Sequence, residues 1–227
     1  MAATERRNRQ AEQTRASILR AAAERFAENG FAATRLEDVG EGVGIGRSGV
    51  LYHFHDKRHL YAAVLDDLFG GLLTELRFVL VRAGTLAERI EAVVCAFVDY
   101  MGSRPAAARI AVRESVNPDS TSRAEIQAQA RPFLMLLEMI FEEGERSGVF
   151  RPTRSDPLHF VSMVAGATLF YIAALPTFVG DLPYDPLSTE QLGAHKRDVL
   201  AITQRLLGTR GPHGVAGVSV APARREP

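Results

Sequence analysis

Residues 14–60, TRASILRAAAERFAENGFAATRLEDVGEGVGIGRSGVLYHFHDKRHL, decide the fold of the N-terminal part of the chain. Apolar residues such as Ile18 and Ala22 recur there at spacings of three and four, which predicts an amphipathic helix over about 12–29. Gly30 follows Asn29 and is a typical helix stop. The stretch therefore opens with a helix whose apolar side needs a partner.

Two shorter helices are expected next, on either side of a glycine-containing turn. Thr34-Arg-Leu-Glu37 has the spacing of a capping box and predicts a helix from about residue 35. Gly42 and Gly44 end that helix, and residues 45–54 predict another. This order, packed by the preceding helix, is typical of a helix-turn-helix DNA-binding motif. Short helices around a glycine turn also occur in other all-α proteins, so the pattern alone leaves the function open.

The last of these helices carries residue types that suit the major groove of DNA. Its start, Gly46-Arg47-Ser48-Gly49, is small enough for the backbone to approach DNA, and Arg47 can pair bidentately with guanine. Tyr52, His53 and Lys57 follow at positions that can reach bases or phosphates. We interpret Arg47 as the main base-reading residue.

Residues 14–60 closely resemble the DNA-binding module of the TetR (tetracycline-repressor) family. The matching features are Ile18-Leu19, Ala22-Ala23, Phe26, Gly30-Phe31, Thr34, Val39, Gly44-Ile45, His53-Phe54, Lys57 and Leu60. The sequence departs from the family at Gly46, where Ser is usual, and at Leu51, where Tyr is usual. Beyond residue 60 the chain is similar to the family in its layout, with a larger helical domain of similar length.

The resemblance implies roles for individual residues. Thr34 would cap the second helix and touch a phosphate. Arg47, Ser48 and Gly49 would face base edges or the DNA backbone. Tyr52 and His53 would reach a phosphate or a base, and Lys57 would reach a phosphate.

Helical patterning continues along the chain without an alternating β-run, so the predicted fold class is all-α. Asp56 can cap a long helix that runs to about Arg82 and is interrupted by Gly70-Gly71. These glycines either let another helix pack closely or form a hinge between the two parts of the chain. Further helix starts are indicated by Pro105 and by capping boxes that begin at Thr85, Ser122 and Ser188.

Length and composition fit a two-part soluble protein, since 227 residues with 46% apolar residues can bury a core. The 27 basic and 27 acidic residues cancel, so any DNA site must be a local patch. The single cysteine, Cys95, excludes an intrachain disulfide. The expected parts are a flexible basic arm at 1–13, a helix-turn-helix domain at 14–60, a helical ligand-binding and dimerisation domain at 61–208, and a disordered tail at 209–227.

Residues 157–180 contain no charged side chain. Their polar residues and the lack of basic flanks argue against a membrane span, and a helix buried on nearly all sides by protein is expected. Large apolar patches mark interfaces, so helices near 158–179 and 189–207 are expected to form a four-helix homodimer interface, as the resemblance also implies. A two-fold dimer suits a near-palindromic operator in double-stranded DNA.

The resemblance also implies a pocket among the central helices for a small-molecule effector that lowers DNA affinity. The candidate lining residues are apolar or aromatic: Phe97, Tyr100, Met101, Phe133, Leu137, Phe141, Phe170 and Tyr171. The same residues at helical spacing can instead be ordinary core. Arg113, Glu114 and Gln127 can orient a ligand or lie at the surface.

The resulting prediction is a cytoplasmic, sequence-specific transcriptional regulator, a repressor released from its operator by a ligand, with no cofactor. The alternative is a helical binding or enzymatic protein that uses its N-terminal module for protein contact. No pattern frames a catalytic nucleophile, so an enzyme is not expected. His55 and His59 have the i,i+4 spacing of a metal pair but lack the HExxH frame, so no metal site is expected either.

Overall fold

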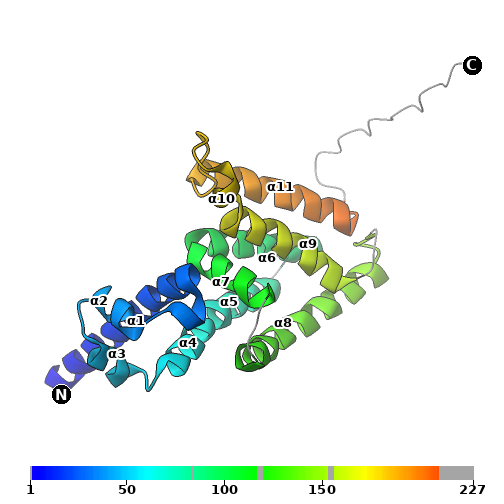
Figure 1. The fold of residues 1–227 in the computed structure, drawn as a ribbon. Helices are drawn as coiled ribbons and strands as arrows, with labels where there is room; N and C mark the ends of the chain where they lie inside the picture. The colour runs from blue at the N-terminus through cyan, green and yellow to red at the C-terminus, as the bar shows by residue number, and fades with distance from the viewer. Residues whose placement is uncertain (1, 83, 117–119, 153–155, 210–227) are drawn as a thin grey trace, which may run out of the picture.

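The computed structural model describes residues 2–82, 84–116, 120–152 and 156–209. Every regular element in these ranges is a helix, and the N-terminal helices form one end of the molecule (Figure 1). The predicted all-α fold with an N-terminal helix-turn-helix is confirmed. The tail expected at 209–227 lies outside the described residues except for Thr209.

Three helices form the N-terminal module: α1 (Ala2–Ala33), α2 (Leu36–Glu41) and α3 (Arg47–His53). Their apolar sides meet in a shared core that includes Ile18, Ala22, Phe26, Val39 and Val50. The amphipathic pattern read from the sequence therefore faces inward, and α1 supplies the surface on which the two short helices pack.

α1 begins earlier than expected. Residues 2–13, expected as a flexible arm, belong to the helix. No Gly or Pro precedes Gly30, and Ala, Arg, Glu and Gln favour helix, so nothing in this stretch breaks it. Gly30 has φ 75° and ψ 172°, so the chain bends at the predicted stop before a final turn ends at Ala33.

Thr34 does not cap α2, so the predicted capping box at this position is wrong. The N-cap residue is Arg35, whose side chain makes no capping hydrogen bond. The Thr34 hydroxyl instead lies 2.8 Å from the carbonyl oxygen of Gly30 and 3.0 Å from that of Arg25. These carbonyls lie where the helix bends and need donors, so Thr34 stabilises the bend from a buried position.

The long helix expected after Asp56 consists of three consecutive segments: α4 (Lys57–Leu65), the π-helical turn η1 (Asp66–Gly70) and α5 (Gly71–Leu80). Asp56 caps α4 as predicted, because its carboxylate accepts a hydrogen bond from the His59 backbone N–H at 2.9 Å. A Cβ at Gly71 would lie 3.1 Å from the Tyr100 hydroxyl, which supports the close-packing interpretation of the glycine pair.

Six further helices make up the larger domain: α6 (Leu86–Ser103), α7 (Pro105–Val116), α8 (Ser120–Arg146), α9 (Pro157–Ala173), α10 (Leu175–Val179) and α11 (Thr189–Leu207). The capping box at Thr85 is present, and Ser188 caps α11 by accepting from the Gln191 N–H. The capping box predicted at Ser122 is wrong, because α8 already begins at Ser120.

α9 has a buried side and an exposed side within the protomer, so the expected burial on nearly all sides is wrong for a single chain. Phe160, Val164, Thr168 and Ile172 are buried at spacings of four. Apolar residues on the other side remain exposed, among them Leu158, Met163 and Phe170. Across the described ranges, none of the helices combines the length and the apolar character that crossing a membrane requires.

Candidate functional site

A tight turn sets the angle between α2 and α3. The Ile45 N–H donates to the carbonyl oxygen of Gly40 at 2.9 Å, and Gly44 adopts a positive φ of 71°. A Cβ at Gly40 would lie 2.5 Å from the Ile45 carbonyl oxygen, so this close approach requires glycine. The glycines of this stretch therefore hold α3 against α2 rather than only ending a helix.

α3 is anchored by one side and exposes the other. Val50 is fully buried, whereas Arg47 and Ser48 are exposed and Tyr52 is 85% exposed. His53 is half-buried, and its ring packs edge-to-face on the Tyr52 ring with 5.2 Å between the ring centres. Three of the predicted contact residues thus lie on a solvent-facing surface of a helix short enough for the major groove.

Gly49 faces the module rather than solvent. A Cβ at this position would lie 3.2 Å from the side chain of Ile45. The absence of a side chain at Gly49 therefore lets α3 pack closely against Ile45, in the turn that precedes the helix. Its small size still permits close approach of the backbone to DNA, but its half-buried position is explained by packing.

Arg47 forms an ion pair with Glu37 on α2, with 3.3 Å between Arg47 Nη1 and Glu37 Oε1. Both side chains remain largely exposed. The sequence pattern placed Glu37 only in a capping box and gave no sign of this pair, because Arg47 lies ten positions away on another helix.

Lys57 lies at the start of α4 and contacts the end of α1. Its ammonium donates to the carbonyl oxygen of Ala32 at 2.9 Å and lies 4.7 Å from the centre of the Phe31 ring. Burial lowers the pKa of Lys57 below its usual value. The residue therefore ties two helices of the module together, and an ammonium has further N–H donors for another acceptor.

His55 and His59 do meet, with ring centres 5.4 Å apart. His59 Nδ1 lies 3.0 Å from the Asp56 carboxylate, and the His59 backbone N–H lowers the pKa of Asp56 by hydrogen bonding. Among the described residues, no group of three or more His, Cys, Asp or Glu side chains is placed to hold a metal ion. Capping of α4 by Asp56 accounts for the contact between Asp56 and His59.

An apolar cavity of about 270 Å³ lies between α5, α6, α8 and α9. Three of the residues predicted to contact a ligand, Phe97, Phe133 and Leu137, line this cavity. The other lining residues are also apolar: Leu72, Leu73, Leu76, Val93, Val94, Ala130, Leu134, Phe160, Val161, Val164 and Ala165. Sequence spacing could not separate this second set from ordinary core residues, which show the same pattern.

The other predicted lining residues lie elsewhere. The Tyr100 hydroxyl donates to the Leu68 carbonyl oxygen at 2.7 Å, and Met101 is buried in the core. Phe141 packs against the rings of Phe150 and Phe160.

Phe170 and Tyr171, also predicted to line the pocket, sit near the α9 and α11 surface. Phe170 is exposed and stacks on Phe178 with ring centres 5.8 Å apart. Tyr171 stacks on His195 at 4.0 Å, and burial lowers the pKa of that histidine. These contacts place both residues outside the cavity lining.

α7 joins the larger domain to the N-terminal module. Arg113 Nη2 donates to the carbonyl oxygens of Ala27 at 3.3 Å and Glu28 at 3.4 Å, beside the bend in α1. The neighbouring Glu114 is buried and accepts a hydrogen bond from the Tyr61 hydroxyl on α4. Arg113 and Glu114 therefore link the two parts of the chain, whereas Gln127 is exposed on α8.

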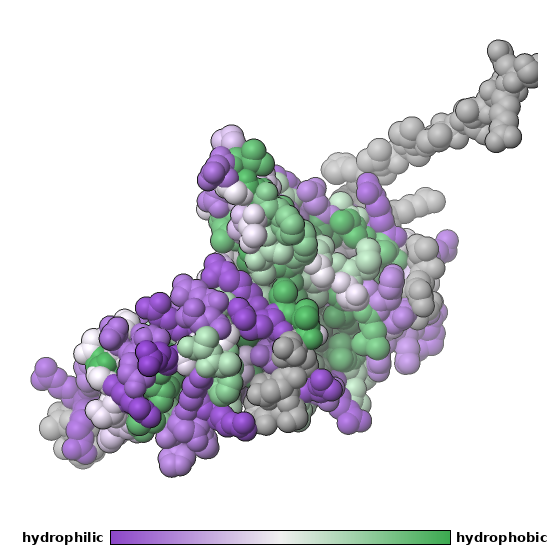
Figure 2. All heavy atoms as spheres, in the orientation of Figure 1, coloured by the Kyte–Doolittle hydropathy of each residue, from purple (hydrophilic) through white to green (hydrophobic). Residues whose placement is uncertain are grey.

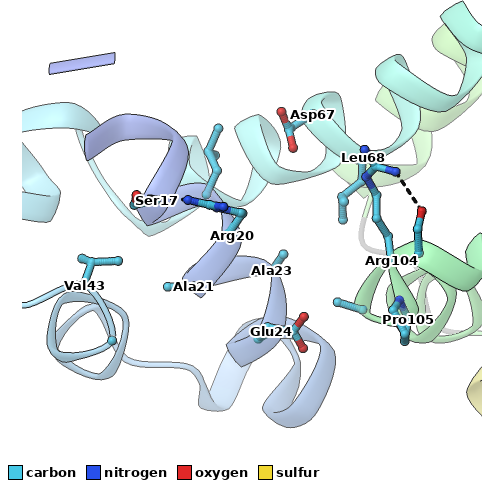
Figure 3. Close-up of a pocket in the computed structure, with 14 residues that line it drawn as sticks. Ser17, Arg20, Ala21, Ala23, Glu24, Val43, Asp67, Leu68, Arg104 and Pro105 are labelled. Atoms are coloured by element: carbon cyan, nitrogen blue, oxygen red, sulfur yellow. Dashed lines mark hydrogen bonds between the residues drawn. The ribbon is translucent and has the colours of Figure 1, made fainter. Parts of the chain in front are cut away.

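A cleft of about 890 Å³ separates the module from the larger domain next to these links (Figure 3). α1, the turn after α2, η1 and the α6–α7 junction form its walls. Arg20 and Arg104 line the cleft together with Glu24 and Asp67, so charges of both signs face it. The cleft occupies only part of this boundary, because α1 also packs along α4 and α7 and the apolar cores of the two parts are continuous.

Apolar side chains gather on the outer surface of α9, α10 and α11. The exposed members are Leu158, Met163, Phe170, Phe178 and Ile202. Figure 2 shows hydrophobic residues over α9 and α10 and a mostly hydrophilic N-terminal module. Contiguous exposed apolar patches are typical of sites that bind another protein or a membrane.

Comparisons with known proteins match both parts of the chain. The family described as "Bacterial regulatory proteins, tetR family" matches residues 18–64. "Tetracyclin repressor-like, C-terminal domain" matches residues 87–202. The HTH-type transcriptional regulator RutR of Escherichia coli K12 is 26% identical over 173 residues, which cover 76% of this chain and 80% of RutR.

Solved structures share the fold. The fatty acid degradation regulator FadR from Bacillus halodurans aligns with a TM-score of 0.67 at 18% identity, covering 87% of this chain and 97% of that one. FadR from Bacillus subtilis, in complex with stearoyl-CoA, aligns with a TM-score of 0.64 at 19% identity, covering 86% and 98%. The helix-turn-helix and the larger domain thus match the same family, and the chain belongs to the tetR family of bacterial regulatory proteins, as a DNA-binding transcriptional regulator.

Proposed function

We propose that this regulator binds a near-palindromic operator as a homodimer, and that a small-molecule ligand releases it. The observation that carries the proposal is the solvent-facing side of α3, where Arg47, Ser48 and Tyr52 are exposed while Val50 anchors the helix in the core. A helix held in this way can enter the major groove without rearrangement of the module. Such a repressor works in the cytoplasm, where its operator lies.

The proposed contacts follow from exposure. Arg47 reads a base, and Ser48, Tyr52 and His53 contact bases or phosphates, while Gly49 lets the backbone come close. Lys57 contacts a phosphate. One N–H of its ammonium donates to the Ala32 carbonyl oxygen, and the other N–H groups donate to the phosphate. Thr34 is left out of the interface, because only 2% of the residue is exposed and its hydroxyl already faces two carbonyls.

Arg47→Ala is expected to cost about 1–3 kcal/mol of operator binding and to relax the preference at one base pair per half-site. Lys57→Ala is expected to weaken binding to all sequences and to lower the salt slope by about 1. Fluorescence anisotropy on a duplex selected by the wild-type protein from a random library, at several salt concentrations, measures both effects.

Two results would contradict this assignment. An Arg47→Ala variant that selects the same operator with the same affinity would show that Arg47 reads no base. A wild-type protein that retains no duplex at low salt would favour the alternative, in which the N-terminal module contacts another protein.

We propose that the ligand places an aliphatic acyl chain in the apolar cavity. Among the residues that the structure describes, those lining the cavity are all uncharged, and its volume of about 270 Å³ suits a slender chain. Bacillus subtilis FadR, which shares the fold, is bound to stearoyl-CoA. The charged part of such a molecule would have to remain outside this cavity, because burying unpaired charge is costly.

α7 is the proposed route from the cavity to the DNA-binding module. It packs on α9, which lines the cavity, and it holds α1 and α4 through Arg113 and Glu114. A ligand lowers DNA affinity only if it binds one arrangement of these elements better than the other.

Ala130→Phe is expected to fill the cavity and to weaken the response to an acyl-CoA about tenfold or more, while operator binding without ligand persists. Ala128→Phe is the matched control, because Ala128 lies on the same helix but is exposed. Operator release is titrated with acyl-CoAs of several chain lengths and with free CoA. Equal responses of both variants and the wild type would show that the cavity does not hold the acyl chain.

A further inference from the structure

We propose that Glu37 is a specificity-determining residue that orients Arg47 for base reading. This inference rests on the proposed function, in which α3 enters the major groove. Glu37 lies on α2 and its carboxylate oxygen Oε1 is 3.3 Å from Arg47 Nη1. Arg47 is the first residue of α3, the helix that is proposed to enter the groove.

The position of the Glu37 carboxylate is set by the fold of the module. Glu37 belongs to the first turn of α2, between the buried residues Leu36 and Val39. The turn that follows α2 is fixed by the hydrogen bond from the Ile45 N–H to the Gly40 carbonyl oxygen at 2.9 Å. α2 and α3 therefore hold Glu37 and Arg47 at a defined separation.

Nothing in α3 itself fixes the Arg47 side chain. Arg47 is the first residue of the helix, and the N-cap residue Gly46 offers no side chain. An unrestrained arginine samples many rotamers and can contact phosphates, which carry no sequence information. The ion pair with Glu37 removes part of that freedom.

The pairing leaves the guanidinium able to read a base. An arginine carries five N–H donors in a planar fork, and Glu37 contacts the Nη1 side. The donors on Nε and Nη2 then form a free edge with the geometry that suits O6 and N7 of guanine. A guanidinium held in this orientation favours one base pair over a diffuse phosphate contact.

A carboxylate in the first turn of α2 suits the helix N-terminus, as that of Asp38 also does, but helix stability does not require the contact with Arg47. Exposed ion pairs contribute little to folding, and a negative charge near the DNA backbone weakens binding to every sequence. A residue that lowers affinity for all DNA while improving the choice among sequences is a known route to specificity. Glu37 therefore lowers the affinity for DNA of any sequence and improves the discrimination between the operator and other sequences.

Glu37→Gln tests this role, with Asp38→Asn as the control that removes the same charge from the same turn. The probes are the operator selected by the wild-type protein, the same duplex with the Arg47-dependent base pair replaced, and a mixed-sequence duplex. Discrimination is the ratio of the dissociation constants for the replaced and the selected duplex. Circular dichroism checks that both variants are folded.

We expect both substitutions to strengthen binding to the mixed-sequence duplex, and only Glu37→Gln to reduce discrimination, by about tenfold. In an Arg47→Ala background, Glu37→Gln should leave discrimination unchanged. Discrimination retained in the single variant, or reduced equally by both substitutions, would overturn the inference and make Glu37 a surface charge only. Failure of the wild-type protein to select any duplex would instead overturn the proposed function, and this inference with it.

Discussion

Phe170→Glu is expected to make the protein monomeric and to reduce its operator affinity by about a hundredfold or more. Phe170 is 54% exposed on α9 and stacks on the exposed Phe178. In a two-fold dimer the substitution occurs in both protomers, so it places two carboxylates in one apolar interface. Both would lose their hydration there without gaining an ion-pair partner, which destabilises the dimer. A monomer binds one half-site only and loses the contribution of the second α3.

Phe78→Glu is the matched control, because Phe78 is 63% exposed on α5, which does not contribute to the exposed apolar surface of α9, α10 and α11. Light scattering or sedimentation at micromolar concentration gives the mass, and anisotropy gives the affinity. A Phe170→Glu variant that stays dimeric would show that this face is not the interface. A monomeric wild-type protein at the same concentration would reject the dimer itself.

Gly144→Ala is expected to lower the free energy of unfolding by about 3 kcal/mol or more. This loss outweighs the gain of about 1 kcal/mol that alanine brings over glycine through its helix propensity. Gly144 lies near the end of α8, and a Cβ there would come 2.0 Å from Phe150 Cδ2 and 2.4 Å from Cε2. The Phe150 ring is buried against Phe141, so it has little room to move. The added methyl group must displace a core ring.

Gly193→Ala on α11 provides the comparison, since a Cβ there would meet only Arg197 Nη1 at an ordinary 3.7 Å. That variant should be at least as stable as the wild type, because alanine favours helix more than glycine does. Chemical denaturation of both variants measures the difference. Equal stability of the two would show that Phe150 adjusts at no cost.

The helices themselves were largely predictable, because the signals that define them are local. The periodicity of residues 12–29, the carboxylate of Asp56 before α4 and the capping box at Thr85 each involve residues within a turn or two of one another. Local signals failed where the side chain had a better partner elsewhere. Thr34 has capping-box spacing, yet its hydroxyl turns to the carbonyls at the bend in α1.

The amino-acid pattern alone was enough to predict a helical chain, an N-terminal helix-turn-helix, and Arg47 at the start of the second short helix. Which aromatic residues line the cavity depended on the packing of the helices, since Phe97 lines it and Phe141 does not, although both lie on amphipathic helices. The same packing decided that Arg113 reaches Ala27, 86 positions away, and that Glu37 meets Arg47. Hydrophobic spacing and caps depend on neighbours along the chain, whereas the partner of a buried ring or of a long charged side chain depends on how the helices pack.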